Sequence, residues 1–457
     1  MAADDMLNQS VSEHYRCPEN FFDFALNGRP ANEEGYFRFG PNAICYGHAA
    51  HASKTPAVSR LYDALADVVS DESRLKLPFS PTEIVDNLRL ERYLTNRGIR
   101  GRCEDALRRL YYFLRPFTNL SMRKQVQKFY AGDWKSRAFP QWPVDCTVEN
   151  LHEELLLLSM KCKRIEKVPF VWFWPKGARG CVMVTHDVET RKGRDYCGKL
   201  MDMDDAYGIK ASFQIVPEKR YPVSGEFLET IRARGFEVGI QDLNHDGRLF
   251  DSKKRFLRRA ESINRYAKEY AAQGFRAAVL YRKPDWYGAL NFAFDLSMPN
   301  VAHTDPQRGG CCTVMPYFIG DILELPVTTT QDYTLFFLLE EYSVELWKRQ
   351  LGAILGKNGL ATFIIHPDYV IESKANAVYR NLLDYLRTVR ETQDVWFALP
   401  TDVNSWWRAR SKMSVVQDGS EWRIVGDGAQ QAVLAYAKNV NGRLVYDLTK
   451  ASSARVS

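Results

Sequence analysis

Four polar side chains follow apolar runs in the C-terminal two-thirds of this 457-residue chain, and all four are of types that catalyse hydrolysis. Asp187 and Glu189 end the run CVMVTHDVE, while His245 and His366 come after the runs FEVGI and LATFII. Two acids separated by a single residue share a face of a strand. They repel each other unless a cation or a shared proton holds them. One acid could bind a metal ion while the other takes a proton from water. The pattern therefore indicates metal-assisted hydrolysis, although a salt-bridged pair or a helix cap would look the same.

The two histidines have carboxylates close by in the sequence. His245 could supply an imidazole to an ion, with Asp242 or Asp246 orienting the ring from outside the ligand shell. His366 leaves its apolar run directly into a proline turn that carries Asp368. A neighbouring carboxylate raises the pKa of a histidine, which suits a general acid. Any one histidine is more often a hydrogen-bonded structural residue, but polar groups at three strand ends together favour a site.

The elements that would position these groups alternate in type from about residue 168 to 404. Short apolar runs alternate with amphipathic segments about seven times, which predicts right-handed βαβ units and a parallel sheet or barrel. In such folds ligands bind at the carboxyl ends of the strands. We expect an α/β fold in three parts: a mainly helical region (1–165), the barrel (166–404) and a small β-rich appendage (405–457). In the first part we expect helices at 61–72, 106–116 and 149–167, from the three- and four-residue spacing of apolar residues.

Composition narrows the class of protein. The net charge of +6 is small and no dense basic run occurs, so we do not expect nucleic-acid binding. We expect neither a membrane span nor a signal peptide. Nine scattered cysteines favour a reducing compartment, and hence the cytoplasm. His48 and His51, with no carboxylate beside them in the sequence, are expected to be surface or packing residues and not zinc ligands.

The order of these motifs resembles the polysaccharide deacetylase (NodB-homology) family, over roughly residues 168–404. The resemblance implies a distorted (β/α)7 barrel. By the same resemblance, Asp187 is the catalytic base, Glu189 and His245 are metal ligands, and His366 protonates the leaving amine.

This chain departs from the family pattern at one position, and the roles of several other residues stay open. The family has His-x-x-x-His where this chain has Gln241 and then His245. The third ligand would be the carbonyl oxygen of Gln241, a rearranged Asp187, or His186. The arginine that holds the base matches Arg276 best, with Arg282 as the alternative. Candidate substrate-facing residues are Arg282, Trp286, Asp295 and His303.

The function implied by the resemblance is removal of N-acetyl or O-acetyl groups from a sugar in a polysaccharide or glycolipid, with a divalent metal ion. Zinc is expected first, and cobalt, manganese or nickel are alternatives. Because Gln241 replaces a ligand, a carbohydrate-binding or scaffold protein with an impaired site is one alternative. An amidohydrolase that acts on a small C–N substrate is another. The sequence leaves the oligomeric state open.

Overall fold

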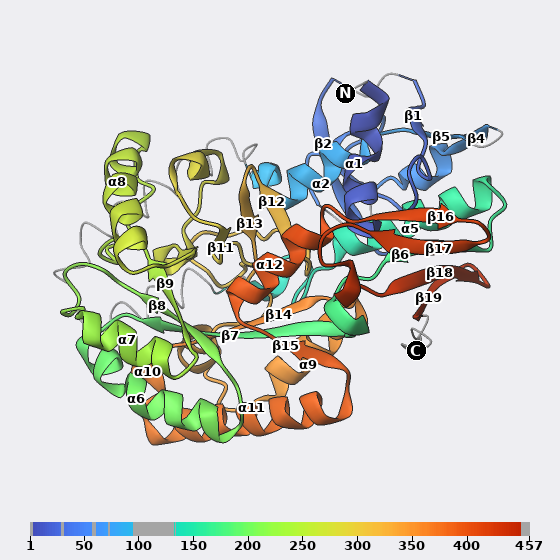
Figure 1. Ribbon diagram of the computed structural model, residues 1–457. Helices are drawn as coiled ribbons and strands as arrows, with labels where there is room; N and C mark the ends of the chain where they lie inside the picture. The colour runs from blue at the N-terminus through green and yellow to red at the C-terminus, as the bar shows by residue number, and fades with distance from the viewer. Residues whose placement is uncertain are drawn as a thin grey trace, which may run out of the picture. The chain divides into compact units, whose positions relative to one another are not determined.

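The computed structural model describes residues 3–28, 32–56, 61–71, 74–94, 132 and 134–448 (Figure 1). The chain divides into two compact units, which are treated separately below. The first comprises residues 1–94, 146–178 and 405–457, and the second comprises residues 95–145 and 179–404. Across the described ranges, no helix has both the length and the apolar character needed to cross a bilayer.

The second unit is built on one curled sheet. Its strands are β7 (Gly180–Val188), β8 (Ala211–Ile215), β9 (Glu237–Gln241), β10 (Gly274–Arg276), β11 (Phe294–Asp295), β12 (Tyr317–Ile319), β13 (Ile322–Glu324), β14 (Leu360–Ile365) and β15 (Val395–Phe397). They follow the order β12-β13-β11-β10-β9-β8-β7-β14, with β15 also paired to β7. Every pairing is parallel except β12 with β13. Parallel strands with crossover connections, predicted by the alternating pattern, are curled here into the distorted (β/α) barrel that the family resemblance implies.

Helices cover the outside of this sheet. They are α6 (Arg191–Ala206), α7 (Gly225–Ala233), α8 (Lys253–Glu269), α9 (Glu345–Gly356), α10 (Pro367–Val370) and α11 (Ser373–Thr392). Three of them begin at a hydroxyl side chain, because Thr190, Ser224 and Ser252 each accept a hydrogen bond from a backbone N–H of the first turn. Helix α9 packs on β14 and β7, and α10 lies between α6 and α11 (Figure 1). The strands are consequently buried on both faces, as their apolar runs require.

The curled sheet approaches closure through side chains between β13 and β14. The hydroxyl groups of Thr328 and Thr329 donate to the backbone carbonyls of Leu360 and Thr362, each at 2.7 Å. The backbone N–H of Thr362 in turn donates to the hydroxyl of Thr328 at 2.9 Å. Threonine hydroxyls thus take the place of a backbone ladder here, and they hold the segment before residue 332 beside β14.

The first unit contains helices and several small sheets. Its helices are α1 (Ala3–Tyr15), α2 (Pro81–Arg89) and α5 (Thr147–Cys162). Its strands are β1 (Phe24–Leu26), β2 (Glu34–Arg38), β3 (Ile44–His48), β4 (Val69–Asp71), β5 (Arg74–Leu77), β6 (Lys167–Val171), β16 (Ser414–Asp418), β17 (Glu421–Val425), β18 (Leu434–Val440) and β19 (Arg443–Leu448). Helix α12 (Pro400–Arg410) runs from the second unit into the first. Strand β18 pairs with both β19 and β6, so the C-terminal strands form a sheet with residues 167–171.

Local predictions and the structure differ most before residue 180. The helix expected at 149–167 is α5, whereas residues 61–72 contain a short 3-10 turn (Ala64–Asp67) and β4. The helix expected at 106–116 lies outside the described residues. The three-part division at 165 and 404 stays a prediction. Each of the two compact units instead combines segments that are distant in the sequence. Strand β11 was not predicted, since two residues are too few to show a periodicity.

Candidate active site

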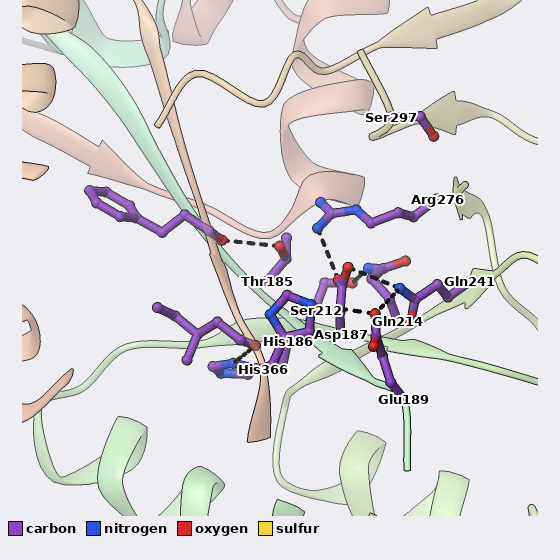
Figure 2. A network of polar contacts seen from close by, with 12 residues as sticks. Thr185, His186, Asp187, Glu189, Ser212, Gln214, Gln241, Arg276, Ser297 and His366 are labelled. Atoms are coloured by element: carbon purple, nitrogen blue, oxygen red, sulfur yellow. Dashed lines mark hydrogen bonds and ion pairs between the residues drawn. The ribbon is translucent and has the colours of Figure 1, made fainter. Parts of the chain in front are cut away.

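The acid pair lies at the carboxyl end of β7, the strand at which β8 and β14 meet. Asp187 and Glu189 point to the same side, toward Gln241 and Arg276 (Figure 2). His186, the residue before Asp187, points the other way, and its Nε2 lies 2.8 Å from a carboxylate oxygen of the buried Asp204. Strand alternation thus separates His186 from the acid pair, as a two-residue period requires.

Arg276 holds the first acid. Its guanidinium is fully buried at the end of β10, and Nη1 donates to Oδ1 of Asp187 at 2.9 Å. Burial raises the pKa of Asp187, and the positive charge of Arg276 opposes that rise. The alternative residue for this role, Arg282, donates from Nη1 to the backbone carbonyl of Leu280 at 2.9 Å. Of the two arginines, it is Arg276 that the structure pairs with Asp187.

Gln241 bridges the two acids. It ends β9, directly beside Arg276 in the sheet register. Its Nε2 donates to Oδ2 of Asp187 at 3.1 Å and to Oε1 of Glu189 at 3.3 Å. Its Oε1 is buried and has no hydrogen-bond partner among the described residues. The amide nitrogen therefore occupies a position between two carboxylates, where a cation is also favoured.

His245 reaches the same carboxylate from the turn after β9. The turn places His245 in the left-handed region, with φ at 53°. Nε2 lies 2.7 Å from Oε1 of Glu189, yet neither ring nitrogen makes an aligned hydrogen bond within the described part of the chain. Burial acts to raise the pKa of Glu189, but His245 and His366 hold it well below its usual value.

His366 faces the acid pair from the end of β14. Nε2 lies 3.4 Å from Oε1 of Glu189, and Nδ1 lies 2.6 Å from Oδ1 of Asp332. The other oxygen of Asp332 accepts the backbone N–H of His366 at 2.7 Å. Burial acts to lower the pKa of His366, but Asp332 and then Glu189 raise it well above its usual value. Sequence reasoning missed Asp332, for which the only signal is an acid at the end of the buried TTTQD run.

The residues present fit a divalent ion. Asp187, Glu189 and His366 each offer a ligand atom, and these atoms lie within 4.8 Å of one another. His245 adds a buried imidazole nitrogen without an aligned hydrogen bond, and Gln241 adds a buried amide oxygen without a partner in the described ranges. A carboxylate with imidazole nitrogen is the donor set that zinc and similar ions bind.

The three carboxylates proposed to support the site make other contacts. One oxygen of Asp242 accepts the backbone N–H of the next residue at 2.7 Å. Asp246 forms a two-pronged ion pair with Arg259, at 2.7 and 2.6 Å. Asp368 accepts hydrogen bonds from the Thr190 hydroxyl and from the backbone at the start of α6. It is Asp332, and not Asp368, whose carboxylate contacts the ring of His366.

The substrate-facing candidates are dispersed. Asp295 is buried at the end of β11 and accepts the Ser297 hydroxyl at 2.7 Å. The ring of His303 lies parallel to that of Trp142, with centroids 6.1 Å apart. Trp286 is half-buried and packs on two phenylalanine rings, Phe250 and Phe256. None of the contacts just given involves the acid pair.

The histidines of the first unit also have neighbours that the sequence did not indicate. Although no carboxylate lies beside His48 in the sequence, Oε1 of Glu83 lies 2.7 Å from its Nδ1 in the structure. His51 instead packs edge-on against the ring of Tyr62. The carboxylate was missed because Glu83 follows His48 by 35 residues and reaches it from α2.

No protein-family description and no curated protein sequence matches this chain. Solved structures similar to it include a protein from Mycobacterium smegmatis named as a polysaccharide deacetylase, at 17% identity and a TM-score of 0.42, covering 55% of this chain and 98% of that one. PuuE allantoinase is similar at 12% identity and a TM-score of 0.40, over 52% and 92% of the two chains. The peptidoglycan deacetylase PdaC from Bacillus subtilis is similar at 11% identity and 0.34, over 50% and 93%. Polysaccharide deacetylases are thus among the solved structures to which this chain is similar.

Proposed function

We propose that this chain is a metal-dependent carbohydrate deacetylase that removes N-acetyl or O-acetyl groups during polysaccharide or glycolipid synthesis. The observation that carries the proposal is the convergence of Asp187, Glu189 and His366, with Arg276 bonded to the first of them. A base, a candidate metal ligand and a general acid thereby meet at one end of a parallel sheet, where α/β enzymes bind their substrates. The cytoplasmic location expected from the sequence stays a prediction.

The mechanism assigns a task to each side chain. Asp187 takes the proton from the attacking water, and the positive charge of Arg276 favours its ionised form, against the effect of burial on its pKa. His366 is kept protonated by Asp332, so that it can give a proton to the departing nitrogen or oxygen. A bound divalent ion would polarise the acetyl carbonyl and lower the pKa of a water molecule, and Glu189 and His245 would hold it.

We propose zinc as the ion, with cobalt, manganese or nickel as alternatives. Two protein ligands are fewer than the three that catalytic zinc usually has. Gln241 supplies the third if its amide turns so that Oε1, instead of Nε2, faces Glu189. An amide oxygen is a weaker zinc ligand than an imidazole and favours harder ions. His186 is excluded from this role in the described arrangement because its ring is hydrogen bonded to Asp204 on the opposite face of β7.

The test is acetate release from N-acetylated oligosaccharides by the purified full chain with and without added zinc. Replacing the base by Asp187→Asn should lower kcat by about 10²–10⁴-fold, the usual contribution of a general base. The matched control is Asp205→Asn, which removes a half-buried carboxylate from the surface of α6. Acetate release that is equal in all three proteins would refute the proposal.

One observation favours a second candidate function. Because the amide nitrogen of Gln241 already bridges both carboxylates, the acid pair is held without an ion. A carbohydrate-binding protein with an impaired site would show this arrangement. Binding of an acetylated oligosaccharide without acetate release, in protein shown to contain no metal after incubation with zinc, would support it.

A further inference from the structure

Two further acids lie at the carboxyl ends of neighbouring strands and have no role in the mechanism above. Asp295 ends β11 and Glu324 ends β13, and they are register partners in the sheet. Register partners in parallel strands point to the same side, so the two carboxyl groups lie within hydrogen-bonding reach of each other. Both are buried, at 1% and 0% exposure.

The surroundings leave one oxygen of this pair without a protein donor. The Ser297 hydroxyl donates to Oδ1 of Asp295 at 2.7 Å, and the Ser297 backbone N–H reaches Oδ2 at 3.3 Å. Oε1 of Glu324 accepts the backbone N–H of Met298 at 3.0 Å. Oε2 of Glu324 is buried with no donor among the described residues. A proton placed between the two carboxyl groups would complete the arrangement.

Burial raises the pKa of both carboxyl groups, and the repulsion of like charge adds to this effect at Glu324. Burial raises the pKa of Glu324 well above its usual value, and the nearby charge of Asp295 raises it further. Burial also raises the pKa of Asp295. Among the described residues, Tyr287 and Arg276 also act on the pair. Two carboxyl groups in such a place share one proton and carry one negative charge.

Arg276 connects this pair to the acid pair on β7. It lies on β10, next to β11, and its positive charge acts on Glu324. Its Nη1 donates to Asp187, whereas its buried Nε and Nη2 have no hydrogen-bond partner within the described ranges. In Figure 2, Ser297, the partner of Asp295, lies beyond Arg276 as seen from Asp187. Arg276 is therefore hydrogen bonded to Asp187 and interacts electrostatically with Glu324.

We infer that Asp295 and Glu324 form a carboxylic acid–carboxylate pair that shares one proton, and that its single negative charge positions Arg276 against the catalytic base. The inference assigns Asp295 to positioning instead of substrate contact. The role in catalysis rests on the proposed deacetylase function, whereas the shared proton does not.

The first part of the experiment is spectroscopic, and it does not require the protein to be an active enzyme. A protonated carboxyl group has an infrared carbonyl band that an ionised carboxylate lacks. The full-length protein should show such a band at neutral pH, and Glu324→Gln should remove it while Asp205→Asn retains it. The control residue is suitable because its lysine and arginine partners hold the pKa of Asp205 below its usual value. A wild-type band that survives Glu324→Gln, or no difference between the two variants, would overturn the shared proton.

The kinetic arm compares variants that keep or remove the charge. Glu324→Gln imitates the protonated partner and leaves the charge on Asp295, so kcat should stay close to wild type. Adding Asp295→Asn removes the charge, and kcat should fall by about 10–100-fold, the usual effect of losing a supporting contact, with KM unchanged. An equal loss in the single and double variants would show a purely structural role. If wild-type protein releases no acetate, the deacetylase proposal fails and the infrared arm still decides the pair.

Discussion

Asp332 contacts His366 twice, through the ring nitrogen Nδ1 at 2.6 Å and through the backbone N–H at 2.7 Å. Both contacts orient the histidine, so that Nε2 is directed toward Glu189. The carboxylate also opposes the effect of burial and raises the pKa of the ring. This pair explains how a buried histidine can remain a proton donor at neutral pH.

Replacing this carboxylate by Asp332→Asn should lower the pKa of His366. A general acid works only below its pKa, so the alkaline limb of the pH profile of kcat should move to lower pH. The stability that Asp332 gives to the fold should also depend on pH. Because the folded-state pKa of His366 is raised, the pair stabilises the fold most at low pH, and this contribution is lost as pH rises through that pKa. Acetate release and thermal unfolding measured from acid to alkaline pH provide the check. An unchanged alkaline limb would contradict the assignment of His366 as the acid.

Replacing Gln241 by histidine should tighten zinc binding, because an imidazole nitrogen is a better zinc ligand than an amide oxygen. Hydrolysis should not decrease. Titration calorimetry of the metal-free protein with zinc measures the affinity. The matched control is Gln241→Met, which is similar in size, has no amide and should not tighten binding. Equal zinc affinity in wild type and Gln241→His would place residue 241 outside the ligand shell.

Replacing Arg276 by glutamine should raise the pKa of Asp187 further, because burial would then act with less opposition. Asp187 must be ionised to act as a base, so the acid limb of kcat/KM should move to higher pH. A buried ion pair broken on one side also costs about 3–5 kcal/mol of stability. The control is Arg259→Gln, which breaks a half-buried pair with Asp246. An acid limb that moves equally in both variants would contradict a specific role for Arg276.

Replacing His186 by leucine should destabilise the fold without weakening metal binding. His186 and Asp204 form a fully buried pair on the outer face of β7, and Tyr379 donates to the same carboxylate at 2.5 Å. Breaking a buried pair costs about 3–5 kcal/mol. Chemical denaturation and zinc titration measure the two effects separately. A large loss of zinc affinity in folded His186→Leu protein would make His186 a ligand after all.

Removing the metal with a chelator should abolish acetate release and lower the melting temperature. An ion that binds only the folded chain stabilises it by about 2.7 kcal/mol at a free concentration of 100 Kd. Addition of zinc should restore both properties, and cobalt or manganese should restore them if the site accepts harder ions. Glu189→Gln replaces the carboxylate ligand by an amide. In this variant, added zinc should restore less acetate release and raise the melting temperature less. Full activity after removal of every divalent ion would refute the metal-dependent mechanism.

Part of this site follows from local sequence alone. The spacing of Asp187 and Glu189 puts them on one face of a strand, and the same rule directs His186 to the other face. The long apolar runs that precede His366 and Gln241 mark strands whose carboxyl ends lie at one edge of a parallel sheet. These inferences need only the backbone period and the rule for parallel connections. They give the fold class and the strand ends that carry polar groups.

Only the tertiary structure decided which side chains meet. The contact of Asp332 with His366 spans 34 residues, and it depends on the threonine hydroxyls that hold the preceding segment beside β14. The pairing of Asp295 with Glu324 depends on the register between β13 and the two-residue strand β11, which has no periodicity to read. The bridge from Gln241 to both acids depends on side-chain torsions at the end of β9. Such contacts are set by the register and packing of distant segments, so the local pattern of the sequence does not determine them.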